Sequence, residues 1–290
     1  MINLKKLDQN GSHVLAVVFI ILLVAVVGFA GWRVGQMNKS DNQENKSASS
    51  DTKDEDQSEE LDPYVVWDYM GGEKWGPLGT APDCKEPLSI KSPMDVSKAT
   101  NVLYPGQVRG GDFKPHGGIG VEGKSDNKVD VKAPMDTYLY RGARHIEQGE
   151  VQYMFDFISP CGIMVRIGHL LKLSPEFEAY ANQLPLGQSG DSRTTKFQTN
   201  TAVKQGALIA TEVGFAKTKN VFFDFGVYDL RKTNEASKDP AFANEPKRKA
   251  DQEQSYYSLC WFDLLSSSEK KTVKALPARG IEGKTSDYCK

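Results

Sequence analysis

The sequence predicts a mainly β domain that an N-terminal transmembrane helix holds outside the cell. Three observations support this fold class: an uninterrupted apolar run near the N-terminus, an acidic stretch after it, and then short apolar runs separated by turn residues. We therefore expect five regions: an N-terminal cytoplasmic tail (1–12), a transmembrane anchor (13–33), a disordered acidic linker (34–62), a β domain (63–232) and a C-terminal extension that docks on the domain (233–290).

The apolar run extends from Val14 to Trp32 and contains no charged residue. At about 1.5 Å per residue, a helix over this run is roughly 28 Å long, which matches the hydrocarbon core of a bilayer. A cleavable signal peptide is the alternative, because Gly28 and Ala30 are small enough to precede a cleavage site. The run is longer than the roughly 7–15 residues of a signal core, which favours an uncut anchor. Both interpretations export the rest of the chain.

The orientation of the anchor is inferred from the cysteines, because lysines and arginines flank the apolar run on both sides and give no clear signal. All four cysteines lie beyond the linker, and their even number is typical of an exported disulfide-bonded domain. We therefore expect a single-pass protein of the cell membrane with an extracytoplasmic domain. Four cysteines allow three full pairings, and we favour the one that joins Cys260 to Cys289; the other two are Cys84 and Cys161.

The distribution of charge limits the possible partners. Between residues 38 and 62, nine carboxylates face three lysines, with almost no apolar residue to form a core. Such a segment acts as a solvated, self-repelling tether. The formal net charge of the whole chain is −2, and no basic stripe with interleaved aromatic residues is present. Nucleic acid is therefore not an expected partner.

After the linker, alternating apolar runs and turn residues predict strands rather than long helices. One helix is expected from Ser174 to Gln183, because Ser174 can cap it and Pro175 suits its first turn. The charged stretch from Arg231 to Gln254 is predicted to be a surface excursion, and the apolar stretch from Tyr256 to Leu265 to return to the domain. The candidate strands are Lys128–Lys132, Thr137–Tyr140, Val151–Ile158, Gly162–His169, Ala207–Val213 and Val221–Tyr228.

Five short motifs occur in an order that resembles the LytM and lysostaphin-like zinc endopeptidases of bacterial cell walls. The family has a His with an Asp four residues later, an ala-pro-x-asp-gly turn, a strand that ends in a catalytic histidine, a val-x-x-gly-x-x-ile-gly strand, and a final his-leu-his-phe-glu-val strand. The corresponding segments here are Pro115–Gly120, Ala133–Thr137, Ile167–Leu171, Val203–Ala210 and Phe222–Val227. The resemblance implies a LytM-like β-sandwich, or hybrid-motif, domain.

The chain departs from the family pattern at the metal ligands. Gly120 stands where the family has its Asp, Phe222 replaces a catalytic histidine, and Asp224 replaces a ligand histidine. The resemblance therefore assigns His116 and Asp224 as remnant metal ligands and His169 as a remnant catalytic residue. Because a catalytic zinc normally has three protein ligands, we expect no cofactor, or zinc if the domain is active.

Plainer interpretations of the same residues remain open. His116 follows a proline in a glycine-rich segment and could serve only a turn, while His169 could form a hydrogen bond in the core. His145 is predicted to be a surface residue, and Phe222 to pack in the core.

The preferred function from the sequence is a degenerate LytM-like domain that binds peptidoglycan or regulates a cell-wall hydrolase without being an enzyme. One alternative is an active zinc-dependent peptidoglycan endopeptidase with an altered ligand set. The other is a structural surface protein unrelated to wall enzymes. The expected partners are the membrane, through the N-terminal helix, and peptidoglycan or a wall hydrolase.

Overall fold

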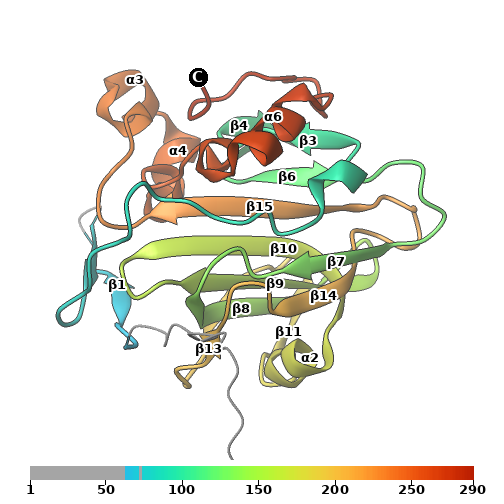
Figure 1. The fold of residues 1–290 in the computed structure, drawn as a ribbon, viewed down its shortest axis with the longest axis horizontal. Helices are drawn as coiled ribbons and strands as arrows, with labels where there is room; N and C mark the ends of the chain where they lie inside the picture. Colours follow the sequence, from blue (N-terminus) through green and yellow to red (C-terminus); the bar gives the residue numbers. More distant parts are fainter. Residues whose placement is uncertain (1–62, 72–73) are drawn as a thin grey trace, which may run out of the picture. The chain divides into compact units, whose positions relative to one another are not determined.

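A computed structural model describes residues 63–71 and 74–290, which belong to one compact unit (Figure 1). The predicted anchor and linker lie outside the described residues. Among the helices of the described part, none is long and apolar enough to cross a membrane. The unit is mainly β, as the sequence predicts.

The largest sheet contains eleven of the described strands. Seven of them lie side by side in the order β11, β8, β9, β10, β15, β6, β3, while β12 and β13 pair with β8, and β14 pairs with β10 and β7. The bounds are β3 Asn101–Leu103, β6 Gly117–Gly120, β7 Lys128–Lys132, β8 Thr137–Glu147, β9 Glu150–Ile158, β10 Ile163–Leu173, β11 Leu186–Ser189, β12 Thr195–Lys196, β13 Ala202–Val203, β14 Leu208–Val213 and β15 Phe222–Asp229.

Strand β10 changes partner along its length. Its first half pairs with β15 up to Gly168, and its second half pairs with β14 from Leu170 onward. The pairing of β10 with β9 shifts register between Ile167 and Leu170. His169 lies at this bulge and has a positive φ of 55°. Bulges redirect side chains near functional sites, and a positive φ is costly for any residue other than glycine.

The alternation of side chains along the central strands separates a core from a polar face. Phe155 and Phe157 of β9, and Phe223 and Phe225 of β15, are buried in the largest apolar cluster. The residues between them point the other way and include Asp156 and Asp224. In β10 the same alternation buries Val165 and Ile167 and leaves Arg166 and Gly168 on the polar face.

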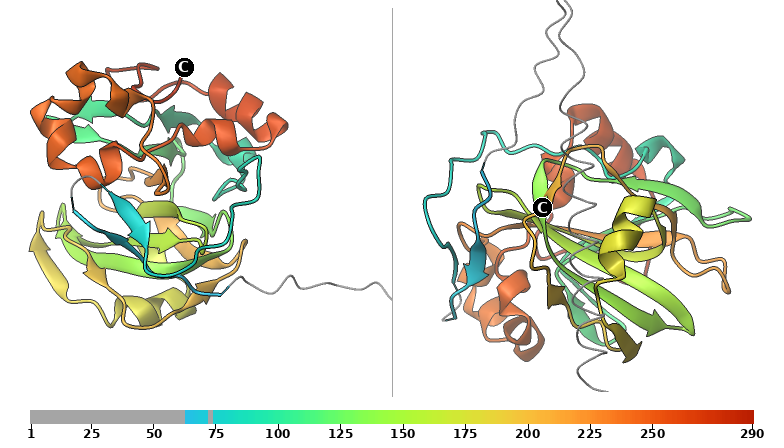
Figure 2. Two further views of the ribbon diagram at one scale, coloured as in Figure 1. Left: turned by 90° about the vertical axis from the view of Figure 1, so that its left-hand side faces the viewer. Right: turned by 90° about the horizontal axis from the view of Figure 1, so that it is seen from below.

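Each of the six predicted strands corresponds to a strand of the main sheet, although β8 extends seven residues beyond its predicted end. The predicted helix is α2, Pro175–Ala181, and the Ser174 side chain accepts a hydrogen bond from the Phe177 amide. Figures 1 and 2 show α2 and the helices of the C-terminal extension at opposite ends of the β structure. Strands β1 to β6 and β11 to β13 were not among the predicted strands. Those outside the main sheet are β1 Trp67–Tyr69, β2 Trp75–Pro77, β4 Gln107–Arg109 and β5 Asp112–Lys114, and a short 3₁₀ turn, η1, spans Val96–Lys98.

The C-terminal extension is an integral part of the compact unit. The predicted surface excursion over Arg231–Gln254 is wrong in one respect, because short helices there pack on the sheet and bury Phe242. Next to them the chain pairs with the last residues of β15, past the end of its pairing with β6: the Leu259 amide donates to the Val227 carbonyl, and the Asp229 amide to that of Tyr257, both at 2.9 Å. The elements are η2 Ala236–Lys238, α3 Pro240–Ala243, α4 Pro246–Ala250, α5 Gln252–Ser255, η3 Trp261–Leu264 and α6 Ser267–Ala275.

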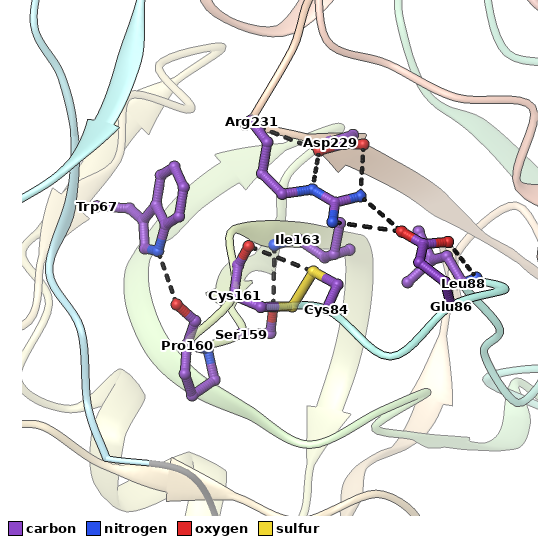
Figure 3. Close-up of a disulfide and its surroundings, with 10 residues drawn as sticks. All are labelled: Trp67, Cys84, Glu86, Leu88, Ser159, Pro160, Cys161, Ile163, Asp229 and Arg231. Atoms are coloured by element: carbon purple, nitrogen blue, oxygen red, sulfur yellow. Dashed lines mark hydrogen bonds and ion pairs between the residues drawn. A yellow bond between two sulfur atoms is a disulfide. The ribbon is translucent and has the colours of Figure 1, made fainter. Parts of the chain in front are cut away.

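Two disulfides fasten the ends of the described chain to the sheet. The predicted pair, Cys260–Cys289, is present, and the second joins Cys84 to Cys161. Cys161 lies in the turn between β9 and β10, where the Trp67 indole also donates to the Pro160 carbonyl at 3.0 Å (Figure 3). The segment before β3 is therefore anchored by a covalent bond and a buried hydrogen bond.

Candidate functional site

A cleft of about 1020 Å³ opens on the polar face of the central strands. Its floor consists of side chains from β8, β9, β10 and β15. The β4–β5 hairpin forms one wall, residues 190–194 form another, and the junction of α4 with α5 forms a third. The cleft is therefore built jointly by the β domain and the C-terminal extension.

The structure brings the three predicted site residues together on the floor of this cleft. His116 immediately precedes β6, His169 lies at the bulge of β10, and Asp224 lies on β15 between these two strands. The Nε2 atom of His116 is 3.1 Å from Oδ2 of Asp224, and Nε2 of His169 is 3.3 Å from the same oxygen. One carboxylate oxygen thus accepts hydrogen bonds from two imidazoles.

Burial and charge assign different protonation states to these groups. Burial alone would raise the pKa of the Asp224 carboxyl, but the two imidazoles outweigh it and hold that pKa well below its usual value. Burial lowers the pKa of His116 more than Asp224 raises it. Burial also lowers the pKa of His169, but Asp224 and Glu147 together reverse this and raise it. The geometry thus favours an ionised Asp224, and it makes His169 easier to protonate than His116.

The arrangement continues along β8. Oε2 of Glu147 is 3.8 Å from Nδ1 of His169 and 3.4 Å from Nε2 of His145. Imidazoles and carboxylates therefore alternate over five side chains, which we call the His–carboxylate row: His116, Asp224, His169, Glu147 and His145. The prediction that His145 is a surface residue is wrong, because the residue is only 5% exposed. The physical reason is the length of β8, whose alternation turns His145 and Glu147 toward the cleft.

Phe222 packs against His169 at the edge of the cleft. The two ring centroids are 4.6 Å apart, and the ring of Phe215 lies 5.2 Å from that of His169. Phe222 was predicted to pack in the core, but its side chain also lines the cleft. The two aromatic rings limit the space around the His169 imidazole and hold it at the bulge.

The donors do not form a complete zinc site. A side chain at Gly120, where the resemblance places an Asp, would overlap the Asn101 side chain on the neighbouring strand β3. No group of three or more His, Cys, Asp or Glu side chains in residues 63–71 and 74–290 is arranged to hold a metal ion. His116 and Asp224 lie side by side as the resemblance implies, but they hydrogen-bond to each other.

A buried ionic network, which sequence reasoning missed, lies beside the row. Asp156 accepts hydrogen bonds from Nε of Arg141 at 2.6 Å and from Nε and Nη2 of Arg166 at 2.7 Å each. Burial opposes ionisation of Asp156, yet the two guanidinium groups lower its pKa to about 2. Nη2 of Arg141 also donates to Glu253 of the extension at 3.1 Å. The sequence signal that could have revealed this network is the charged residues that alternate with apolar ones within the central strands.

Comparison of the chain with protein-family models, with curated proteins and with solved structures gave no match.

Proposed function

We propose that the cleft binds a peptide of bacterial peptidoglycan, and that the domain is a degenerate LytM-like module that binds the wall or regulates a wall hydrolase. The observation that carries this proposal is the meeting of His116, His169 and Asp224 on one cleft floor. These residues come from three separate segments of the chain, and the family resemblance was the reason to expect them together. Fold alone does not fix function, so the argument depends on the site.

Two features of the site, one in the His–carboxylate row and one at Gly120, favour binding of a ligand over zinc catalysis. Nε2 of both histidines lies within hydrogen-bond distance of the same Asp224 oxygen, which makes the row a set of polar groups that can exchange hydrogen bonds with a ligand. The third ligand position is a glycine whose side-chain space is filled by Asn101. A catalytic zinc normally has three protein ligands and an open water position, and the ligand position at Gly120 supplies no side chain.

The size and the charges of the cleft suit a peptide with ionised groups. Pockets for small ligands have volumes of about 300–1000 Å³, and this cleft lies at the upper limit. Its lining includes several arginines and several carboxylates, together with apolar side chains such as Met154 and Phe222. A wall peptide carries amide groups and charges of both signs, which match such a surface.

The predicted anchor and linker would place the module near its target. A flexible linker of the length of residues 34–62 has a root-mean-square span of about 30 Å, and at most about 100 Å when fully extended. If the linker starts at the outer face of the membrane, the domain and its cleft would move within the space that the wall occupies. The tether would also raise the local concentration of the module at the wall, so that modest affinity is sufficient.

The test is co-sedimentation of the full-length chain, purified in detergent, with insoluble peptidoglycan. Gly168 on the cleft floor provides a matched pair of variants. A Cβ there would meet Asp224 Cβ at 3.6 Å and Met154 Cγ at 3.7 Å, which are ordinary contacts, so Gly168→Ala is tolerated. The branched side chain of Gly168→Val would extend into the cleft. We expect Gly168→Ala to be retained like wild type and Gly168→Val to bind about tenfold or more weakly, from a steric cost of roughly 1–3 kcal/mol.

Two results would overturn the proposal. One is the absence of retention of the wild-type chain on peptidoglycan together with no effect on the rate at which a wall hydrolase digests it. The other is equal retention of Gly168→Val and wild type, since binding would then occur away from the cleft. If the wild-type chain changes the rate at which a wall hydrolase digests peptidoglycan and Gly168→Val does not, the module regulates the hydrolase through this cleft.

A further inference from the structure

The wall that the C-terminal extension adds to the cleft presents three hydrogen-bond acceptors. Asp251 lies between α4 and α5, and Glu253 and Gln254 belong to α5; all three line the cleft. This wall is fixed in place on several sides. The Trp75 indole donates to the Glu253 carbonyl, the Tyr288 hydroxyl donates to the Ser255 carbonyl, both at 2.8 Å, and the Cys260–Cys289 disulfide closes the segment behind it.

Two of these acceptors have no hydrogen-bond partner among residues 63–71 and 74–290. Asp251 is the N-cap of α5, yet its side chain makes no capping hydrogen bond, and no hydrogen bond to its carboxylate is found among the described residues. The side-chain oxygen of Gln254 is buried without a partner, and this residue is only 4% exposed. Buried polar atoms are almost always hydrogen-bonded, so an unpartnered acceptor that lines a cleft indicates a missing donor.

The local charges determine the sign of that donor. The guanidinium groups of Arg141 and Arg166 are both engaged with Asp156, and Arg141 also pairs with Glu253. Two guanidinium groups therefore face three carboxylates when Asp251 is ionised. The Lys114 ammonium also acts on Asp251, but it is paired with Asp112 at 3.7 Å, so one negative charge remains in excess. Burial, with the charge of Glu253, raises the pKa of Asp251 to about 6 against the charges of both arginines and Lys114. A cation in the cleft would compensate this charge.

We propose that Asp251, Glu253 and Gln254 form a subsite for an ammonium group of the ligand, so that the cleft selects wall peptides that carry a free amine. This inference depends on the proposed function, because it specifies the ligand of the same cleft. A primary ammonium is a compact charge with three N–H donors, which matches three acceptors within the four residues 251–254. N-acylation of the amine removes the charge and two of the donors, so acylated wall peptides bind poorly.

The test compares two forms of one peptidoglycan preparation: untreated, and with its free amines acetylated by acetic anhydride. The full-length chain in detergent is titrated against each form, as wild type, as Asp251→Asn, and as the control Asp130→Asn. Asp130 is an exposed carboxylate on β7 outside the cleft, so both variants lose one negative charge. Because hydrogen bonds between ionised groups are the strong ones, we expect acetylation and Asp251→Asn each to weaken binding about tenfold, and Asp130→Asn to have no effect.

The combination of the two changes gives the decisive comparison. If the amine binds at Asp251, the Asp251→Asn variant no longer distinguishes untreated from acetylated wall, because both changes remove the same interaction. Wild-type binding that is unaffected by acetylation overturns this inference and leaves the proposed function standing. If the losses of affinity from acetylation and from Asp251→Asn add up, the inference is also overturned, because the amine then binds elsewhere. Failure of the wild type to bind untreated wall overturns the proposed function and this inference with it.

Discussion

The substitution Asp251→Asn is expected to stabilise the protein at neutral pH, although it removes a charged residue beside two arginines. The pKa of Asp251 is raised from 3.8 to about 6 in the folded chain. A raised pKa means that the folded state binds a proton more tightly than the unfolded state, so stability falls as the pH rises from 3.8 to about 6 and the loss is complete above that. The shift of about two units, at about 1.4 kcal/mol per unit, corresponds to a cost of about 3 kcal/mol once the group is ionised.

The pH dependence gives this prediction its sharpest test. Asparagine resembles the protonated form, so the stabilisation should be about 3 kcal/mol at pH 7.5 and about 1 kcal/mol at pH 4.5, where folded wild type is mostly protonated. The free energy of unfolding is measured by denaturant titration of the full-length chain at both pH values, followed by tryptophan fluorescence. Asp130→Asn is the control. Destabilisation at pH 7.5, or a difference that does not change with pH, would refute the argument that Asp251 is a carboxylate held at a cost.

Three further predictions concern the buried charges and the disulfides. Asp156→Asn should lower the free energy of unfolding by about 3–5 kcal/mol at neutral pH, because it leaves buried guanidinium groups without their partner. The stabilisation by ionised Asp156 is present above about pH 4 and is lost as the pH falls toward its folded pKa of about 2. The double substitution of Cys260 and Cys289 by serine should cost about 3–4 kcal/mol in the chain-entropy estimate. Glu147→Gln should lower the pKa of His169, followed by NMR titration of its imidazole, because it removes one of the two charges that raise that pKa.

Each of these has an opposing result. An Asp156→Asn variant with wild-type stability would show that the arginines are hydrated rather than held by the carboxylate. Unchanged unfolding of the cysteine variant would mean that the extension is held by packing alone. An unaltered His169 titration in Glu147→Gln would remove Glu147 from the His–carboxylate row and shorten it to three residues.

The sequence predicted most of the central strands because their apolar alternation is local. The resemblance of the motifs to the wall endopeptidases led to His116, His169 and Asp224, and the structure places these three side chains together. His145 was mistaken for a surface residue because its strand continues past a glycine and charged residues that resemble a turn. The function of these groups is a proposal that the distances support and that binding experiments must test.

Other parts of the cleft could not be predicted, because they depend on contacts between distant residues. The pair of Arg141 with Glu253 joins residues 112 positions apart, and no local pattern indicates it. The same holds for Asp251, whose burial results from the way the extension folds back over the sheet. The charged composition of this extension suggested a solvated excursion, but its short helices supply one wall of the site. The predicted anchor lies outside the described residues.

The proposed function requires that a wall peptide contact His116, Asp224 and His169 of the His–carboxylate row. It is tested most directly by recording the imidazole ¹⁵N resonances of the two histidines during a titration with soluble peptidoglycan peptides. We expect both resonances to shift and saturate together at one peptide per chain, and Gly168→Val to raise the peptide concentration needed for saturation about tenfold or more. Resonances that stay in place while the peptide binds with saturation would contradict it.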